Sequence, residues 1–357
     1  MKDISRQSGL TLIELLIAST LGLILLVGVV QLFVSGSDTF RMAEAIGRMQ
    51  ESGRLAQDVL GRSIRNADYW GCRNAGDVAG SLDTVLDSGN ADYDADRHDF
   101  GSFQALEFGV APAGGNRVAG SATLIVRGAT SLGIHLDASM GAQADALDVN
   151  STAGVNLNDI LMLTDCEDSV AFQATGITGG DTIAHAAGKA SGPGTGTRDT
   201  PGNSVAELPK SYASGEIFRL YATSYFLEEN PTTGIRSLMM RTISNASAQE
   251  VVSDIHDMQM QVGLGDSGDN VINNWLDVNT TNLPAIDSGF VKAVRISLLV
   301  RSPNDRVASQ RQAVCFPAWT DCSNSANLWQ PAADDRHYYR VYTSMYSVRN
   351  RLLNTGT

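Results

Sequence analysis

The stretch that decides the fold is Ser8-Gly9-Leu10-Thr11-Leu12-Ile13-Glu14-Leu15-Leu16-Ile17-Ala18-Ser19. An apolar run starts after Gly9 and continues to about Val34. Between Leu15 and Val34 the chain offers roughly 20 residues without a charge, which is the length that a helix needs to cross a bilayer. We therefore expect residues 10–34 to form a membrane anchor.

One carboxylate, Glu14, interrupts the start of this apolar run. An acid inside a membrane span costs on the order of 2.5–3.5 kcal/mol, less near an end, and such residues usually have a partner. The simpler alternative is an ordinary signal anchor that tolerates an acid near the interface. The short leader that ends in Gly9, with an acid five residues beyond it, favours a more specific role for Glu14.

This combination resembles the prepilin signature of the type IV pilin superfamily. The resemblance implies that a prepilin peptidase cleaves the Gly9–Leu10 bond and methylates the new amino terminus, so that Leu10 becomes the first residue. It also implies that Glu14 is the acid used in assembly. Leu10 is a mild departure, because the commonest first residue in the family is phenylalanine.

Charge and length limit the remaining function classes. The 357-residue chain carries a formal net charge of −13, which argues against a nucleic-acid binder because such proteins show a basic stripe.

Lys2 and Arg6 precede the apolar run, so the positive-inside tendency leaves the leader in the cytoplasm and exports the rest. The run is too long for a removable secretory signal. We expect a single-pass inner-membrane protein with a periplasmic body.

Four cysteines fit an exported protein, namely Cys72, Cys166, Cys315 and Cys322. They allow three disulfide pairings, and free buried thiols are the alternative. A Cys315–Cys322 bond would close a small loop, worth ~2.5 kcal/mol in the chain-entropy model. A Cys72–Cys166 bond would then tie the end of the first helix to the sheet body, worth ~4.5 kcal/mol. Without C-x-x-C spacing, a zinc site is not expected.

Helical periodicity continues beyond the membrane run. The positions with spacings of three and four are Met42, Ile46, Met49, Gly53, Ala56, Leu60, Ile64 and Ala67. We expect one helix of roughly 85 Å from Leu10 to about Ala67, ended by a glycine in the segment 66–72. Six glycines weaken it, namely Gly22, Gly28, Gly36, Gly47, Gly53 and Gly61. Close helix packing and unwinding in a filament explain them equally well.

The chain after the helix indicates short strands joined by Gly/Ser/Asp/Asn-rich connections. The expected strands are Ala105–Val110, Ser121–Arg127, Ile160–Thr164, Ser169–Thr175, Ile217–Leu227, Ile235–Ile243, Ile255–Leu264, Lys292–Arg301 and Tyr338–Val348. Lys292–Arg301 alternates cleanly, which predicts an antiparallel strand with one wet side. Residues 229–234 predict a hairpin turn, and Gly176–Asn203 a long loop that is functional or disordered.

The expected fold is therefore α+β, a long N-terminal helix packed on an antiparallel β-rich body, similar to pilins. We divide the chain into a leader (1–9), a transmembrane or filament-core helix (10–34), its amphipathic continuation (35–67), a β-rich globular domain (68–350) and a tail (351–357).

Segments spread over the body also resemble the PilW-type minor pilins. They are Asn66–Cys72, Asn158–Cys166, Ser253–Gln261 and Tyr346–Asn350. The resemblance implies a minor subunit that primes type IV pilus assembly at the inner membrane and ends at or near the pilus tip. Its implied partners are other minor pilins, the major pilin, a PilY-type tip adhesin and the prepilin peptidase. Because Glu14 is present, we expect this subunit to dock onto another one.

Catalytic chemistry is not indicated, and we expect no catalytic residue, cofactor or metal. Gly265–Gly268 is similar to the nucleophile turn of chymotrypsin-like proteases, but Asp269 follows it, and the histidines are scattered singly. Gly188-Lys189-Ala190 lacks the Ser or Thr of a phosphate loop. Asp92–Asp99 is similar to a calcium loop without its glycine and its final acid, so a solvated acidic loop is favoured.

Two alternatives stay open. One is a minor pseudopilin of a type II secretion system, which would have the same anchor and general fold. The other is a membrane-anchored periplasmic binding protein or enzyme whose first segment merely mimics the prepilin signature.

Overall fold

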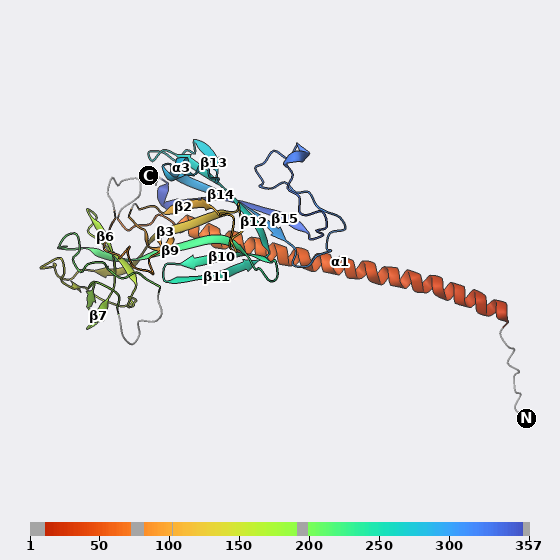
Figure 1. Ribbon diagram of the computed structural model, residues 1–357, viewed down its shortest axis with the longest axis horizontal. Coiled ribbons are helices and arrows are strands. Elements are labelled where there is room, and N and C mark those ends of the chain that lie inside the picture. Colours follow the sequence, from red (N-terminus) through yellow and green to blue (C-terminus); the bar gives the residue numbers. More distant parts are fainter. Residues whose placement is uncertain (1–10, 73–81, 102, 191–198, 353–357) are drawn as a thin grey trace, which may run out of the picture.

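A single helix, α1 (Leu12–Asn66), dominates the computed structural model, which describes residues 11–72, 82–101, 103–190 and 199–352. Its 55 residues span about 82 Å. Figure 1 shows its amino-terminal half projecting from the body and its other half lying within it. Thr11 caps the helix in a reciprocal box with Glu14, in which each side chain accepts the other residue's backbone N–H. The prediction of one continuous helix is confirmed.

The end of α1 differs from the glycine stop that we predicted. The capping residue is Ala67, in an extended conformation, and Asp68 follows with a φ of 65°. Gly71 lies beyond the helix, in a turn where its φ is 75°. A Cβ there would lie 2.5 Å from the ring of Phe218, so the glycine serves close packing against β9.

The buried face of α1 begins later than the periodicity predicted. Met49, Ala56, Leu60 and Ile64 are buried as expected, but Met42 is 38% exposed and Ile46 only half-buried. The face packs on strands β14 and β15. Only the part of the helix that the body reaches can bury its apolar stripe, which explains the shift.

The described residues of the body form three sheets. The eight-stranded sheet contains β1 (Asp83–Thr84), β2 (Leu106–Val110), β3 (Ala122–His135), β5 (Ile160–Thr164), β6 (Ser169–Gln173), β9 (Glu216–Glu229), β10 (Arg236–Thr242) and β11 (Asn245–Ser253). The four-stranded sheet has the order β13 (Asn274–Asp277), β12 (Ile255–Gly265), β14 (Phe290–Arg301) and β15 (Tyr339–Ser347). The three-stranded sheet joins β4 (Leu147–Asp148), β8 (Thr182–Ala184) and β7 (Gly176–Thr178). Short helices complete the described chain: α2 (Ala95–His98), α3 (Leu283–Asp287), η1 (Ser325–Asn327) and η2 (Arg349–Arg351).

Strand pairing in the described residues is antiparallel, apart from the short parallel pair of β1 and β6. The predicted hairpin is confirmed, because β9 and β10 pair across the turn at Asn230. Strand β3 runs eight residues beyond its predicted end at Arg127 and stays paired to β9 as far as His135. The α+β class is thus confirmed.

Two expectations about the body are wrong. Strand β14 has no wet side, because Ser297 and Leu299 are fully buried on the face predicted to be polar. The segment between β14 and β15 folds back over that face, where Phe316 and Tyr339 pack on Leu299. The stretch 176–203 is not a structureless loop in its described part, since it forms the β7–β8 hairpin with Ile183 in the core. The segment that covers β14 and the packing of the β7–β8 hairpin both depend on long-range contacts, which local periodicity does not reveal.

Candidate assembly surface on the amino-terminal helix

The amino-terminal half of α1 is left largely uncovered by the described chain, although its last turns line a pocket together with Arg306, Val307 and Ser309. No residue from Leu12 to Glu44 is buried, and side chains as large as Leu12 and Phe33 are each 78% exposed. This is the one described helix that is long and apolar enough to cross a membrane. An apolar surface of this size needs lipid or other apolar helices around it. The segment fits single-pass membrane anchoring.

Glu14 lies in the first turn of this exposed segment. Its Oε2 accepts hydrogen bonds from the backbone N of Thr11, at 3.0 Å, and from Thr11 Oγ1, at 2.9 Å. Both bonds use the same oxygen, and Oε1 accepts no hydrogen bond from the described residues. The carboxylate can therefore cap its own helix and still take an external cationic donor. Gly9 and Leu10, the residues predicted for processing, lie outside the described residues.

The far end of α1 is fixed to the body by covalent and ionic links. A disulfide joins Cys72 to Cys166, which lies two residues after the end of β5. A second disulfide joins Cys315 to Cys322. Asp68 is fully buried, and its Oδ2 accepts a 2.5 Å bond from Arg351 Nε. The first bridge and this ion pair hold the helix end against the sheet and the carboxyl-terminal segment.

Sequence reasoning missed the contacts that seat α1 on β15. Gly53 lies under the ring of Tyr342 and Gly61 under the ring of Tyr346, where a Cβ would come within 2.7 and 2.2 Å of ring carbons. Tyr346 also donates its hydroxyl to the backbone oxygen of Gln57. The sequence did contain a signal for these contacts. Gly53 and Gly61 are eight residues apart on one face of the helix, and the two tyrosines are four residues apart in one strand. Close packing therefore explains Gly53 and Gly61.

The residues that resemble catalytic or metal motifs have other contacts. Asp92 pairs with Lys189, while Asp94 caps α2 and pairs with Arg97. His98, at the end of α2, is buried, and burial together with the nearby Arg97 lowers its pKa to about 4. Asp269, after the protease-like turn, pairs with the buried Lys292.

One group of three possible metal ligands occurs in the described part of the chain, at Asp305, Asp335 and His337. Asp335 already accepts hydrogen bonds from His337 and from Tyr339 Oη, so the cluster is explained by its own contacts.

Comparisons with known proteins agree with this arrangement. The family model of type IV pilus-assembly protein W matches residues 224–350, and the prokaryotic N-terminal methylation motif matches residues 4–30. A comparison with curated protein sequences gave no match. A solved type IV-like pilin from Thermus thermophilus is similar over 86% of this chain and 98% of its own, at 11% identity and a TM-score of 0.32.

The methylation motif covers the start of the exposed helix, and the assembly-protein match covers part of β9 and everything from β10 to the start of η2. The chain is thus similar to PilW-type pilus-assembly proteins over residues 224–350 and carries the N-terminal methylation motif at residues 4–30.

Proposed function

We propose that the protein is a minor pilin that primes assembly of a type IV pilus and sits at or near its tip with other minor pilins. The observation that carries the proposal is the exposed apolar half of α1, with a single carboxylate near its start. The match to a pilus-assembly family over residues 224–350 favours a pilus over a secretion machine. No step in this role requires catalysis by the protein itself.

Processing comes first in the proposed sequence of events. A prepilin peptidase cleaves Gly9–Leu10 and methylates the amino group of Leu10. Until assembly, the anchor holds the protein in the inner membrane with its body in the periplasm. The protein then leaves the lipid and enters the pilus, where neighbouring helices cover the apolar side chains of residues 12–34.

Glu14 then sets the register of this subunit against its neighbour. Its carboxylate pairs with the methylated amino terminus of the adjacent pilin. In a low-dielectric helix bundle such a pair is strong, and a carboxylate left without a partner is costly. Among the described residues Oε1 accepts no hydrogen bond, and the Thr11 cap uses only Oε2, so the carboxylate is oriented and can still take a partner, which supports this role.

The body favours a place at an end of the filament. Its sheets and the folded-back segment between β14 and β15 make a head that is bulky for a subunit repeated along a thin fibre. Other minor pilins, the major pilin and a PilY-type adhesin are the proposed neighbours.

A matched pair of variants tests the proposal. Glu14→Ala removes the assembly carboxylate, whereas Glu44→Ala removes an exposed acid of the same helix whose partner is Arg48. We expect both variants to be processed, and only Glu14→Ala to disappear from sheared pili and to reduce pilus number. Normal incorporation of Glu14→Ala would overturn the proposal.

A further inference from the structure

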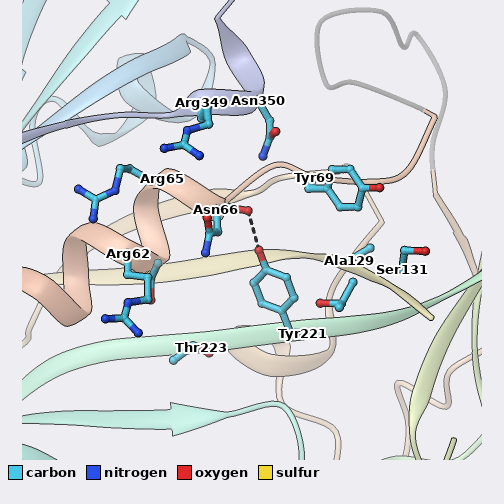
Figure 2. Close-up of a pocket in the computed structure, with 12 residues that line it drawn as sticks. Arg62, Arg65, Asn66, Tyr69, Ala129, Ser131, Tyr221, Thr223, Arg349 and Asn350 are labelled. Carbon is cyan, nitrogen blue, oxygen red and sulfur yellow. Dashed lines mark hydrogen bonds between the residues drawn. The ribbon is translucent and has the colours of Figure 1, made fainter. Parts of the chain in front are cut away.

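A cationic pocket lies at the carboxyl-terminal end of α1. Its volume is about 490 Å³. Arg62 and Arg65 of α1 and Arg349 of η2 form one side (Figure 2). Figure 2 shows these three side chains on one side of Tyr221, with Tyr69 on the other. The pocket is therefore an open groove between the helix, the carboxyl-terminal segment and strands β3 and β9.

The positive charge of this groove is not neutralised by its lining. None of the described residues that line it is acidic, although the chain as a whole carries a net charge of −13. Arg62 pairs with Asp58 at 2.8 Å, but this pair is exposed and weak. Arg65 lies over the ring of Tyr346, and Arg349 has no ion-pair partner among the described residues. At least two guanidinium groups are thus available to an anion.

The helix dipole does not account for this cluster. Cations in the last turn stabilise a helix, and this effect can explain Arg65 but not Arg62, which lies one turn earlier. However, the carbonyl groups there already have donors, since Tyr221 Oη donates to Asn66 O and Asn350 Nδ2 to Ala67 O. Arg349 comes from a separate element more than 280 residues away in sequence, so its approach creates a site.

The chemistry of the groove selects carboxylates on an extended chain. Guanidinium groups bind carboxylates through two parallel hydrogen bonds. The opposite wall offers hydroxyl groups and the ring of Tyr69, which is 39% exposed and can cover the aliphatic stem of a bound side chain. An open groove with several separated cations fits a peptide with successive acidic residues better than one small anion.

We propose that this groove binds an acidic peptide segment of a neighbouring pilin subunit. The inference rests on the proposed function, because an assembled subunit would present such a segment in a fixed position. The groove lies at the opposite end of α1 from Glu14. It therefore supplies a second contact, made by the head of the protein and independent of the helix bundle.

Calorimetric titration of the full chain in detergent tests the inference with three probes: hexaglutamate, hexalysine and an oligogalacturonate. The double variant Arg62→Gln/Arg349→Gln removes two cations, and Arg54→Gln is the control on an exposed face of α1. We expect hexaglutamate binding that weakens with salt, falls about tenfold or more in the double variant and is unchanged in the control. Hexalysine should not bind.

Three results would overturn the inference. They are no binding of hexaglutamate to the wild-type chain, equal binding by the double variant, or tighter binding of oligogalacturonate, which would identify an acidic polysaccharide as the ligand. Amino-terminal processing and pilus incorporation are measured on the same variants. If peptide binding fails while processing and Glu14-dependent incorporation persist, only this inference fails, and the proposed function stands.

Discussion

The contact between Gly61 and Tyr346 gives the sharpest prediction about how α1 is held. A Cβ at position 61 would lie 2.2 Å from Tyr346 Cε1 and 2.5 Å from Cζ. The ring cannot swing aside freely, because its hydroxyl donates to Gln57 O at 2.7 Å. At Gly47, on the same helix, an added Cβ would meet no atom within 4 Å. Identical Gly→Ala substitutions therefore meet opposite surroundings.

The magnitudes follow from two opposing effects. Replacing a helix-interior glycine by alanine favours the helix by about 1 kcal/mol. Forcing an extra methyl group into a packed contact costs about 1–3 kcal/mol. We expect Gly47→Ala to raise the free energy of unfolding by about 1 kcal/mol, and Gly61→Ala to leave it unchanged or lower it by up to about 2 kcal/mol.

The assay is urea unfolding of the full chain in detergent, followed by tryptophan fluorescence. Trp70 is a suitable reporter, because it is buried just beyond the end of α1 with its ring edge against Phe103. The double variant Gly61→Ala/Tyr346→Ala measures the coupling directly, since removing the ring should relieve the clash. If Gly61→Ala proved as stabilising as Gly47→Ala, the packing explanation of the glycine would be refuted.

Three further variants test other parts of the structure. Asp68→Asn leaves Arg351 buried without its counter-charge and should lower the free energy of unfolding by about 3–5 kcal/mol, measured in the same urea assay. His98 stays neutral in the folded chain down to a pKa of about 4 but is protonated in the unfolded chain below its ordinary value of 6.5. Stability should therefore fall as pH drops from 6.5 to 4, and His98→Asn should flatten that part of the pH profile. Cys72→Ser/Cys166→Ser opens a loop with a separation of 94 residues and should cost about 4.5 kcal/mol.

Each of these variants has a control in the same chain. Asp58→Asn breaks an exposed ion pair and should cost less than about 1 kcal/mol. His135→Gln changes an exposed histidine and should change the free energy of unfolding by less than about 0.5 kcal/mol. Cys315→Ser/Cys322→Ser opens a loop with a separation of 7 and should cost about 2.5 kcal/mol. A control that matched its paired variant would contradict the corresponding argument.

The long helix could be predicted from sequence almost to its ends, because unbroken apolar composition and then helical periodicity specify it locally. The β9–β10 hairpin followed in the same way from two apolar runs around Asn230. The start of the buried face could not be predicted, since it depends on how far the body reaches along α1.

The errors concern contacts between distant segments. Ser297 and Leu299 lie on the face of β14 that the alternating pattern predicts to be exposed to solvent. In the structure the segment before β15 covers this face. The Asp68–Arg351 pair joins residues 283 positions apart, and neither residue has a local pattern that indicates burial. The groove at Arg349 has the same origin, because its cations meet only after η2 docks beside α1.

Mass spectrometry of the amino terminus of the native protein tests the central claim most directly. We expect a chain that begins at Leu10 and carries one methyl group on its α-amino nitrogen. A mature protein that still begins at Met1, with an unmodified leader through Gly9, would contradict it.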